Sequence, residues 1–445
     1  MNRKEKATIK KSIFILSCFY LLTACSHPVN DNIPSAQSSS PPAVSTPSAE
    51  SAPPPASPPP AETSPPGAPA AETPNEAAIE IHTPNVSQRE LPDSEALRFT
   101  ADMKAGWNLG NTFDSTGSGV SKGLGETAWG NPKTTREMIQ KIHEAGFRSI
   151  RIPVSWHDHA DADFNIDAAW MERVAEVAGY ALDENMYVIL NIHHDDGVKY
   201  VYPDSEHYEN SSKYIKTVWK QIAEQFKDKS EKLIFESINE PRLIGTEHEW
   251  DMQNVPDLYK DAIETLNKLN QDFVDTVRAT GGNNTDRCLM VPGICASPGS
   301  ALHSSFKLPQ DTAAGRLIVS VHAYTPWNFA MAEVGNQSCV ETFDMTQNSS
   351  TVEINGFMDK LYDKFIKNSI PVVIGEYGAI EKNGNLRDRI EYHAFYIASA
   401  RARGMTCFVW DNGKRDPRKD GYALFDRRNG VWYFPDIIAA MMKYS

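Results

Sequence analysis

Short apolar runs rich in β-branched residues recur eight times between residues 95 and 445, and amphipathic helical patterns separate most of them. The runs cover 104–109, 148–154, 187–193, 233–238, 288–294, 317–323, 371–377 and 405–410. The helical patterns cover 134–145, 168–184, 213–227, 258–279, 354–368, 386–403 and 436–443. Strand alternating with helix eight times is the pattern of an α/β protein with a (β/α)8 barrel, or TIM barrel. We therefore predict one such domain at 95–445.

A doubly wound open sheet is the alternative fold for this pattern. It requires a glycine-rich phosphate loop directly after the first strand. The glycine-rich segment at 116–123, Thr-Gly-Ser-Gly-Val-Ser-Lys-Gly, follows no predicted strand directly and precedes no predicted helix. The sequence therefore favours the barrel.

Polar side chains gather where the predicted strands end, and in a barrel the carboxyl ends of the strands carry the active site. Glu240 and Glu376 each follow a buried apolar run, where a carboxylate is costly unless something uses it. The complete set at these ends is Asn108, Asn111, Arg151, His193, His194, Asn239, Glu240, His322, Tyr324, Glu376, Trp410 and Asp411. Paired carboxylates of this kind suit hydrolysis of a glycosidic bond, which needs one proton donor and one charged carboxylate.

Metal chemistry and covalent serine chemistry fit this set poorly. Successive residues on a strand point to opposite faces, so His193 and His194 are not expected to share one ion. The set also lacks the serine, histidine and aspartate order of a nucleophile elbow. We therefore expect no metal and no cofactor.

In order and position, the motifs around these residues resemble glycoside hydrolase family 5, the large cellulase family. They are Gly-Trp-Asn-Leu-Gly-Asn-Thr at 106–112, Trp-Gly-Asn-Pro-Lys-Thr at 129–134, Arg-Ile-Pro-Val-Ser-Trp at 151–156, Asn-Ile-His-His-Asp at 191–195, Asn-Glu-Pro at 239–241, Val-His-Ala-Tyr at 321–324, Gly-Glu-Tyr-Gly at 375–378 and Phe-Val-Trp-Asp-Asn at 408–412. The first motif, together with Arg242 after Asn-Glu-Pro, resembles subfamily 4, whose endoglucanases also take xyloglucan and mixed-linkage glucan.

The resemblance implies a role for each site residue. Glu240 matches the general acid/base and Glu376 the nucleophile of a retaining mechanism. Arg151 matches the residue that keeps the nucleophile ionised. The implied substrate-binding residues are Asn111, Asn239, His193, His194, His322, Tyr324 and Trp410, with Trp410 as the floor under the sugar that is cleaved. Trp129, Trp250 and Trp327 lie in strand-end loops and are candidate sugar platforms, although each could equally serve local packing.

Two expectations concern charge. Burial should raise the pKa of Glu240, and Arg151 should hold the pKa of Glu376 down. The implied substrate is a β-glucan, so the reading is an endo-1,4-β-glucanase or xyloglucanase. A family 5 hydrolase with another backbone preference, such as mannan, and a non-catalytic polysaccharide-binding barrel remain alternatives.

The first 25 residues read as an export signal. Lys and Arg cluster in 1–11, and an apolar stretch too short to favour a mature membrane span follows. It ends in Leu-Thr-Ala-Cys at 22–25, which resembles the lipobox of bacterial lipoproteins, so Cys25 is the predicted lipidation site. An ordinary signal peptide and a retained anchor are the alternatives. We expect an exported protein that is anchored by lipid to the bacterial cell surface or outer membrane.

Residues 26–94 are rich in Pro, Ser, Ala and Thr and contain no Lys or Arg before Arg89. Such a segment cannot bury enough apolar area to fold, so we predict a disordered spacer. The loss of residues 26 to about 90 should leave the barrel equally stable. A linker between two modules is the other reading.

Charge and cysteine content narrow the partners further. The formal net charge of −14 and the lack of a basic stripe argue against nucleic acid, and a monomer is expected. Cys288, Cys295, Cys339 and Cys407 fit no metal pattern and are read as free thiols, with a Cys295–Cys339 bridge as the alternative.

Overall fold

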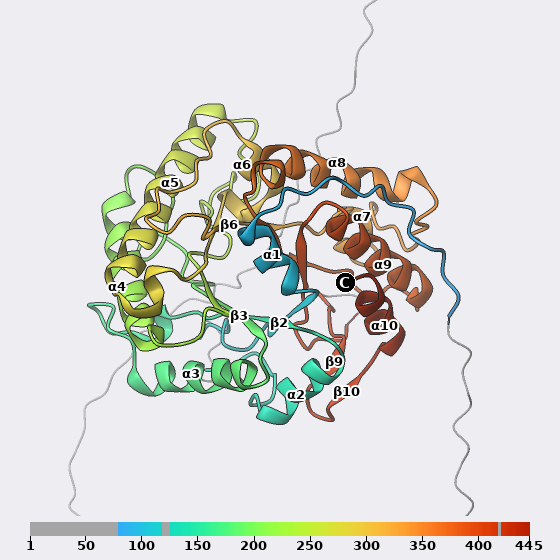
Figure 1. Cartoon of the computed structure of the whole chain (residues 1–445), viewed down its shortest axis with the longest axis horizontal. Coiled ribbons are helices and arrows are strands. Elements are labelled where there is room, and N and C mark those ends of the chain that lie inside the picture. The colour runs from blue at the N-terminus through green and yellow to red at the C-terminus, as the bar shows by residue number, and fades with distance from the viewer. Residues whose placement is uncertain (1–78, 118–124, 417–419) are drawn as a thin grey trace, which may run out of the picture. The chain divides into compact units, whose positions relative to one another are not determined.

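A computed structural model describes residues 79–117, 125–416 and 420–445 (Figure 1). The predicted export signal at 1–25, its lipidation site Cys25 and the spacer up to residue 78 lie outside the described residues. Among the helices of the described part, none has the length and apolar character needed to cross a membrane.

Eight parallel strands close into one barrel in chain order, as predicted. They are β1 (Gly106–Asn108), β2 (Ser149–Ile152), β3 (Tyr187–Asn191), β4 (Leu233–Glu236), β5 (Leu289–Pro292), β6 (Leu317–His322), β7 (Val372–Tyr377) and β8 (Thr406–Val409). Each strand lies inside its predicted run. The barrel closes where Gly106 of β1 pairs with Phe408 of β8. A Cβ atom at Gly106 would lie 2.2 Å from the Phe408 ring, so this closure needs glycine.

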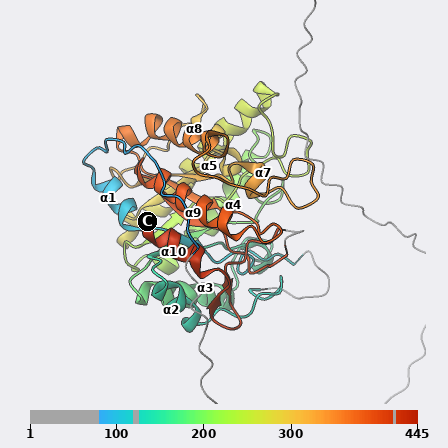
Figure 2. The same cartoon turned by 90° about the vertical axis from the view of Figure 1, so that its right-hand side faces the viewer.

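Helices surround the barrel, as Figures 1 and 2 show from two directions. They are α1 (Glu95–Asp102), α2 (Arg136–Glu144), α3 (Ala168–Asp183), α4 (Tyr208–Phe226), α5 (Pro256–Ala279), α6 (Pro298–Leu302), α7 (Trp327–Ala330), α8 (Asn348–Lys364), α9 (Leu386–Arg401) and α10 (Pro435–Tyr444). A short hairpin of β9 (Phe425–Asp426) and β10 (Val431–Trp432) precedes α10. Local chemistry starts several helices: Asp167 caps α3 by accepting from the Trp170 amide, and Pro256 opens α5.

The barrel interior has an apolar half and a polar half. Side chains alternate along each strand, so the inward positions run in steps of two. At the amino ends these positions hold an apolar cluster, which Met103 closes from the end of α1. The cluster comprises Met103, Tyr187, Ile189, Ile234, Cys288, Met290, Ile318, Val373 and Phe408. Nearer the carboxyl ends of the strands, the inward positions are polar. We call this polar half the upper half of the barrel, and it carries the site.

Residues 79–94 pack on the barrel, so the predicted boundary at residue 95 is too late. We call this segment the N-terminal strap. Arg89 pairs with Asp359 of α8 at 2.6 Å, and the Tyr362 hydroxyl donates to the Glu90 carbonyl at 2.6 Å. Ile81 and Val86 pack against the hydrophobic core. The spacer composition hid these anchors, because the few apolar and charged residues that make them are scattered among polar ones.

Deleting the strap should destabilise the domain, contrary to the expectation for a plain spacer. A chain that begins at residue 95 loses the ion pair of Arg89, the hydrogen bond from Tyr362 and the apolar contacts of Ile81 and Val86. We expect it to melt roughly 5 °C below a chain that begins at residue 79, by calorimetry. The chain that begins at 79 is the matched control. Equal melting temperatures would mean that the strap adds nothing to stability.

Candidate functional site

Glu240 and Glu376 meet at the carboxyl ends of the strands, with His322 between them. Glu376 lies in β7, Glu240 follows β4 by four residues, and His322 ends β6. One polar atom from each of the three lies within 4.8 Å of the other two. His322 Nδ1 is 2.8 Å from Glu240 Oε1 and 3.7 Å from Glu376 Oε1. The sequence prediction that these strand ends converge is therefore confirmed for all three residues.

A register shift in β7 turns Glu376 inward. Val373 points into the barrel, so strict alternation would place Glu376 on the opposite face. The pairing of β6 with β7 shifts by one residue at this point: Val321 pairs with Ile374, and His322 pairs with Glu376. The extra residue is Gly375, where a Cβ atom would lie 3.0 Å from His322 Nε2. Such irregularities re-aim side chains beside active sites.

Arg151 is the hub of the polar half and is fully buried. Its Nη1 donates to Glu376 Oε1 at 2.7 Å and to Asn108 Oδ1 at 3.1 Å. Its Nη2 donates to Asn239 Oδ1 at 2.7 Å, and its Nε donates to Glu236 Oε2 at 2.7 Å. The predicted pairing of Arg151 with Glu376 is confirmed, but the guanidinium is shared between two carboxylates.

Tyr324 completes the surroundings of Glu376. Its hydroxyl donates to Glu376 Oε2 at 2.9 Å, while Arg151 serves Oε1. Burial and the charge of Glu376 raise the pKa of Tyr324 well above its ordinary value, so the hydroxyl keeps its proton. Both carboxylate oxygens of Glu376 thus accept a hydrogen bond from a fixed donor, an arrangement that suits the ionised form.

Protons are shared within this cluster. Burial acts to raise the pKa of Glu240, but the hydrogen bond and charge of His322 outweigh it and lower that pKa. Burial acts to lower the pKa of His322, but Glu376 and Glu240 outweigh it and raise that pKa. Both shifts describe one proton on the 2.8 Å hydrogen bond between the two groups. Moving that proton from Nδ1 to Oε1 turns the ion pair into a neutral acid beside a neutral imidazole.

The expected directions of both carboxyl pKa shifts were therefore wrong. The pKa of Glu240 is lowered because His322 lies beside it and adds a positive charge, a neighbour that the sequence pattern did not predict. Burial raises the pKa of Glu376 against the pull of His322 and Arg151. The charge of Glu240 acts on the pKa of Glu376 in the same direction as burial.

His193, His194, Trp129 and Trp410 line the mouth beside this cluster. The His193 ring is parallel to the Trp410 indole at 6.0 Å, and the His194 ring lies 5.7 Å from the Trp129 ring. A Cβ atom at Gly110 would lie 2.6 Å from Trp410, so glycine leaves room for the indole. Burial lowers the pKa of His194 to about 4 and that of His193 well below its ordinary value, so both rings are neutral at neutral pH.

The expectation that His193 and His194 point to opposite faces was wrong. Strand β3 ends at Asn191, so the alternation that holds within a strand no longer applies two residues later. The two rings lie 4.4 Å apart. With Asp114 they place three possible ligand atoms within 4.8 Å of one another, but Asp114 also accepts from the backbone amides of Asn111 and Thr112.

Comparison with known proteins identifies the family. The family model described as cellulase, glycosyl hydrolase family 5, matches residues 112–416. The chain belongs to glycoside hydrolase family 5.

Among curated family 5 relatives, Endoglucanase B of Clostridium cellulovorans is 41% identical over 356 residues, which are 79% of this chain and 76% of that protein. Cellulase/esterase CelE of Acetivibrio thermocellus is 38% identical over 80% of this chain, which spans only 41% of that protein's length.

Solved structures of family 5 agree. A mutant lichenase from Caldicellulosiruptor sp. F32, in complex with cellotetraose, superposes with a TM-score of 0.80 at 48% identity and covers 82% of this chain and 99% of its own. A GH5-4 broad specificity endoglucanase from Ruminococcus champanellensis with bound cellotriose superposes with a TM-score of 0.72 at 38% identity. The match covers 80% of this chain and 100% of that one. The predicted resemblance to family 5 and its subfamily 4 is confirmed.

Three other predicted residues follow the carboxyl ends of β1, β4 and β6. Asn111 has a φ of 54°, and its carbonyl accepts from Asn131 at 2.8 Å. Trp327 opens α7, and Trp250 is 62% exposed with its ring 4.6 Å from the Arg242 guanidinium. Their roles in binding sugar remain predictions.

Glu236 was not among the residues predicted for the site, and Arg242 was named only as part of the resemblance to subfamily 4. Glu236 is a charged residue inside the apolar run of β4, on the same face as Ile234, and this placement was a usable signal. Arg242 pairs with Asp196 at 3.1 Å and donates to the Glu240 carbonyl at 3.1 Å, which fixes the backbone that carries Glu240. Burial raises the pKa of Asp196 to about 7 despite this pairing.

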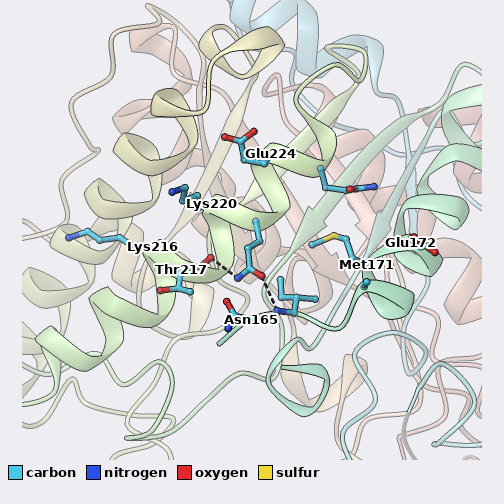
Figure 3. Close-up of a pocket in the computed structure, with 11 residues that line it drawn as sticks. Asn165, Met171, Glu172, Lys216, Thr217, Lys220 and Glu224 are labelled. Carbon is cyan, nitrogen blue, oxygen red and sulfur yellow. Dashed lines mark hydrogen bonds between the residues drawn. The ribbon is translucent and has the colours of Figure 1, made fainter. Parts of the chain in front are cut away.

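A groove of about 850 Å³ lies elsewhere, on the outer side of the barrel between α3 and α4 (Figure 3). Lys216, Lys220 and Glu224 of α4 form one wall, and Met171 and Glu172 of α3 form the other. Its described lining includes no aromatic ring on which a sugar could stack. None of the carboxylate-site residues lines the groove, so the groove is separate from that site.

The four cysteines outside the export signal are free thiols, so the alternative Cys295–Cys339 bridge is not formed.

Proposed function

We propose that this protein is an endo-acting, retaining β-1,4-glucanase that hydrolyses cellulose-type, mixed-linkage or xyloglucan chains. The separation of the two carboxyl groups carries the proposal: an oxygen of Glu240 and an oxygen of Glu376 lie within 4.8 Å. Retaining glycosidases hold these groups about 5 Å apart, whereas inverting enzymes leave about 6.5–9.5 Å for a water molecule between carboxylate and sugar.

In the first step, the Glu376 carboxylate attacks the anomeric carbon and forms a glycosyl ester. The bond from that carbon to the leaving oxygen breaks, and the oxygen takes the proton that Glu240 shares with His322. In the second step, water attacks the same carbon and gives its proton to Glu240, and the ester bond to Glu376 breaks. Two inversions at one carbon give net retention.

Neighbouring groups fit this sequence of events. Arg151 fixes the Asn239 amide by binding its Oδ1, which turns the amide NH2 group the other way, where it can donate to a sugar hydroxyl. Trp410 offers an apolar face to a sugar ring, and Tyr324 holds the oxygen of Glu376 that does not contact Arg151. Binding of the 2-hydroxyl by Asn239 would strengthen as charge develops on the sugar.

The names of the relatives support β-glucan over other backbones, since they read endoglucanase and lichenase. The test is hydrolysis of carboxymethyl-cellulose, xyloglucan, barley β-glucan, xylan and mannan. We expect cleavage of glucans, with the viscosity of carboxymethyl-cellulose falling faster than reducing ends appear, because cleavage is internal. Cleavage of mannan alone would contradict the substrate assignment, and cleavage of none would contradict the activity.

We also propose that the enzyme is exported and tethered through Cys25, on the strength of Leu-Thr-Ala-Cys at 22–25. A palmitate analogue supplied to cells should label the wild-type protein and not Cys25→Ser. The control is Cys18→Ser, which changes the other cysteine of the export signal and should keep the label. A mature protein that begins at another residue would contradict the tether.

A further inference from the structure

Two buried carboxylates in the upper half of the barrel share the guanidinium of Arg151. Glu236 is fully buried and Glu376 is 5% exposed, and both accept from Arg151 at 2.7 Å. Buried carboxylates need a charged or hydrogen-bonding partner, and here two carboxylates compete for one guanidinium.

Glu236 is held more rigidly than its competitor. Its Oε1 accepts from the Ser320 hydroxyl at 2.6 Å, and its Oε2 accepts from Asn191 Nδ2 at 3.0 Å as well as from Arg151 Nε. These donors come from three different strands, β6, β3 and β2. Glu236 is fully buried below the mouth of the barrel, so it does not meet the sugar.

We propose that Glu236 is a positioning residue: it holds Arg151 through Nε and takes part of the guanidinium's charge, and so limits how strongly Arg151 stabilises the ionised form of Glu376. Glu236 orients Arg151 because the three nitrogen atoms of the guanidinium are held in one rigid plane. With Nε fixed on Glu236, Nη1 reaches Glu376 and Nη2 reaches Asn239. One buried carboxylate therefore sets the aim of two hydrogen bonds at the site. This proposal rests on the assignment of Glu376 as nucleophile.

Other charged groups also act on Glu376 and remain unchanged in the test. His322 and Tyr324 face it from β6 and the following loop, Glu240 faces it from the loop after β4, and Asp420 adds a more distant charge from the loop after β8. Glu236 itself is faced by Arg151, Asn191, Ser320 and, at 4.0 Å, His322.

The sign of the expected effect follows from charge. In Glu236→Gln, a negative charge near Glu376 disappears and Arg151 keeps only one carboxylate partner. Both changes favour ionised Glu376, so its pKa falls. The acid limb of kcat/KM reports the group that must be ionised in the free enzyme, so this limb should move to lower pH, by about one unit. A changed orientation of the Arg151 guanidinium in this variant should also lower kcat.

The substrate for this test is dinitrophenyl cellobioside, whose leaving group needs no proton, so that the acid limb reports Glu376 and not Glu240. Glu236→Met, which is also neutral, should shift the acid limb of kcat/KM in the same direction. This variant replaces Glu236→Gln in the test if the Gln variant does not fold. The matched control is Ser320→Ala, which removes a hydrogen bond to Glu236 but keeps its charge, and its limb should stay at the wild-type pH.

An acid limb at the wild-type pH in the neutral variants, or one displaced to higher pH, would overturn the proposal and leave Glu236 a structural residue. Failure of the proposed function is distinguishable, because the wild-type enzyme would then cleave neither dinitrophenyl cellobioside nor glucan.

Discussion

Replacement of Glu376 by alanine should lower kcat on barley β-glucan at least about a thousandfold, because no covalent intermediate can form without the attacking carboxylate. Folding should be kept, since the variant leaves Arg151 paired with Glu236. The exposed Glu353→Ala, on α8, is the matched control and should retain wild-type activity.

Direct evidence for Glu376 would come from a 2-fluoro cellobioside with a good leaving group. The fluorine slows both steps, and the good leaving group lets the first step proceed, so the glycosyl ester accumulates. Mass spectrometry of peptides should place the label on Glu376. A label on Glu240 or on another carboxylate would reject the assignment.

Replacement of Glu240 by alanine should affect substrates unequally. Removing a general acid costs about a hundredfold to ten-thousandfold when the leaving oxygen must be protonated. We therefore expect a loss of this size in kcat/KM on barley β-glucan and a far smaller loss in kcat/KM on dinitrophenyl cellobioside, because kcat/KM reports the first step and the leaving group of this substrate departs as an anion. Comparable losses on both substrates would show that Glu240 is not the proton donor.

The second step offers an independent check on Glu240. Water attacks the glycosyl ester with the help of a base, whereas azide needs none. Added azide should therefore speed turnover of dinitrophenyl cellobioside by Glu240→Ala and give a β-glycosyl azide. It should not rescue Glu376→Ala in that way, because there the missing group is the nucleophile. An α-glycosyl azide from Glu240→Ala would contradict the retaining mechanism.

The sequence was sufficient to predict the barrel and most of its site because each rests on a local pattern. Apolar runs alternate with amphipathic helices, and polar residues at the ends of parallel strands must converge on one face. Glu240, His322, Tyr324, Glu376 and Arg151 followed from this rule.

What the sequence did not disclose depends on contacts between distant segments. Glu236 ends β4, but it lies inside the longer apolar run 233–238 that the sequence predicts as a strand. The bulge at Gly375 breaks the alternation that would have turned Glu376 outward, and the proton shared by His322 and Glu240 requires their 2.8 Å contact. The strap at 79–94 was hidden because its anchors are partners on α8 and α9.

The course of the strap has a practical meaning for attaching this enzyme to a support. Arg387, at the start of α9, donates to the Glu80 carbonyl, while the Arg89 amide donates to the carbonyl of Ala402, just beyond the end of α9. Residue 79 therefore emerges at the level of the substrate-binding mouth. At the other end, the Ser445 hydroxyl accepts from the Ala105 amide, just before β1 and thus on the opposite face of the barrel. Immobilisation through the carboxyl terminus would leave the mouth facing the polymer, whereas a bulky fusion at residue 79 would crowd its rim.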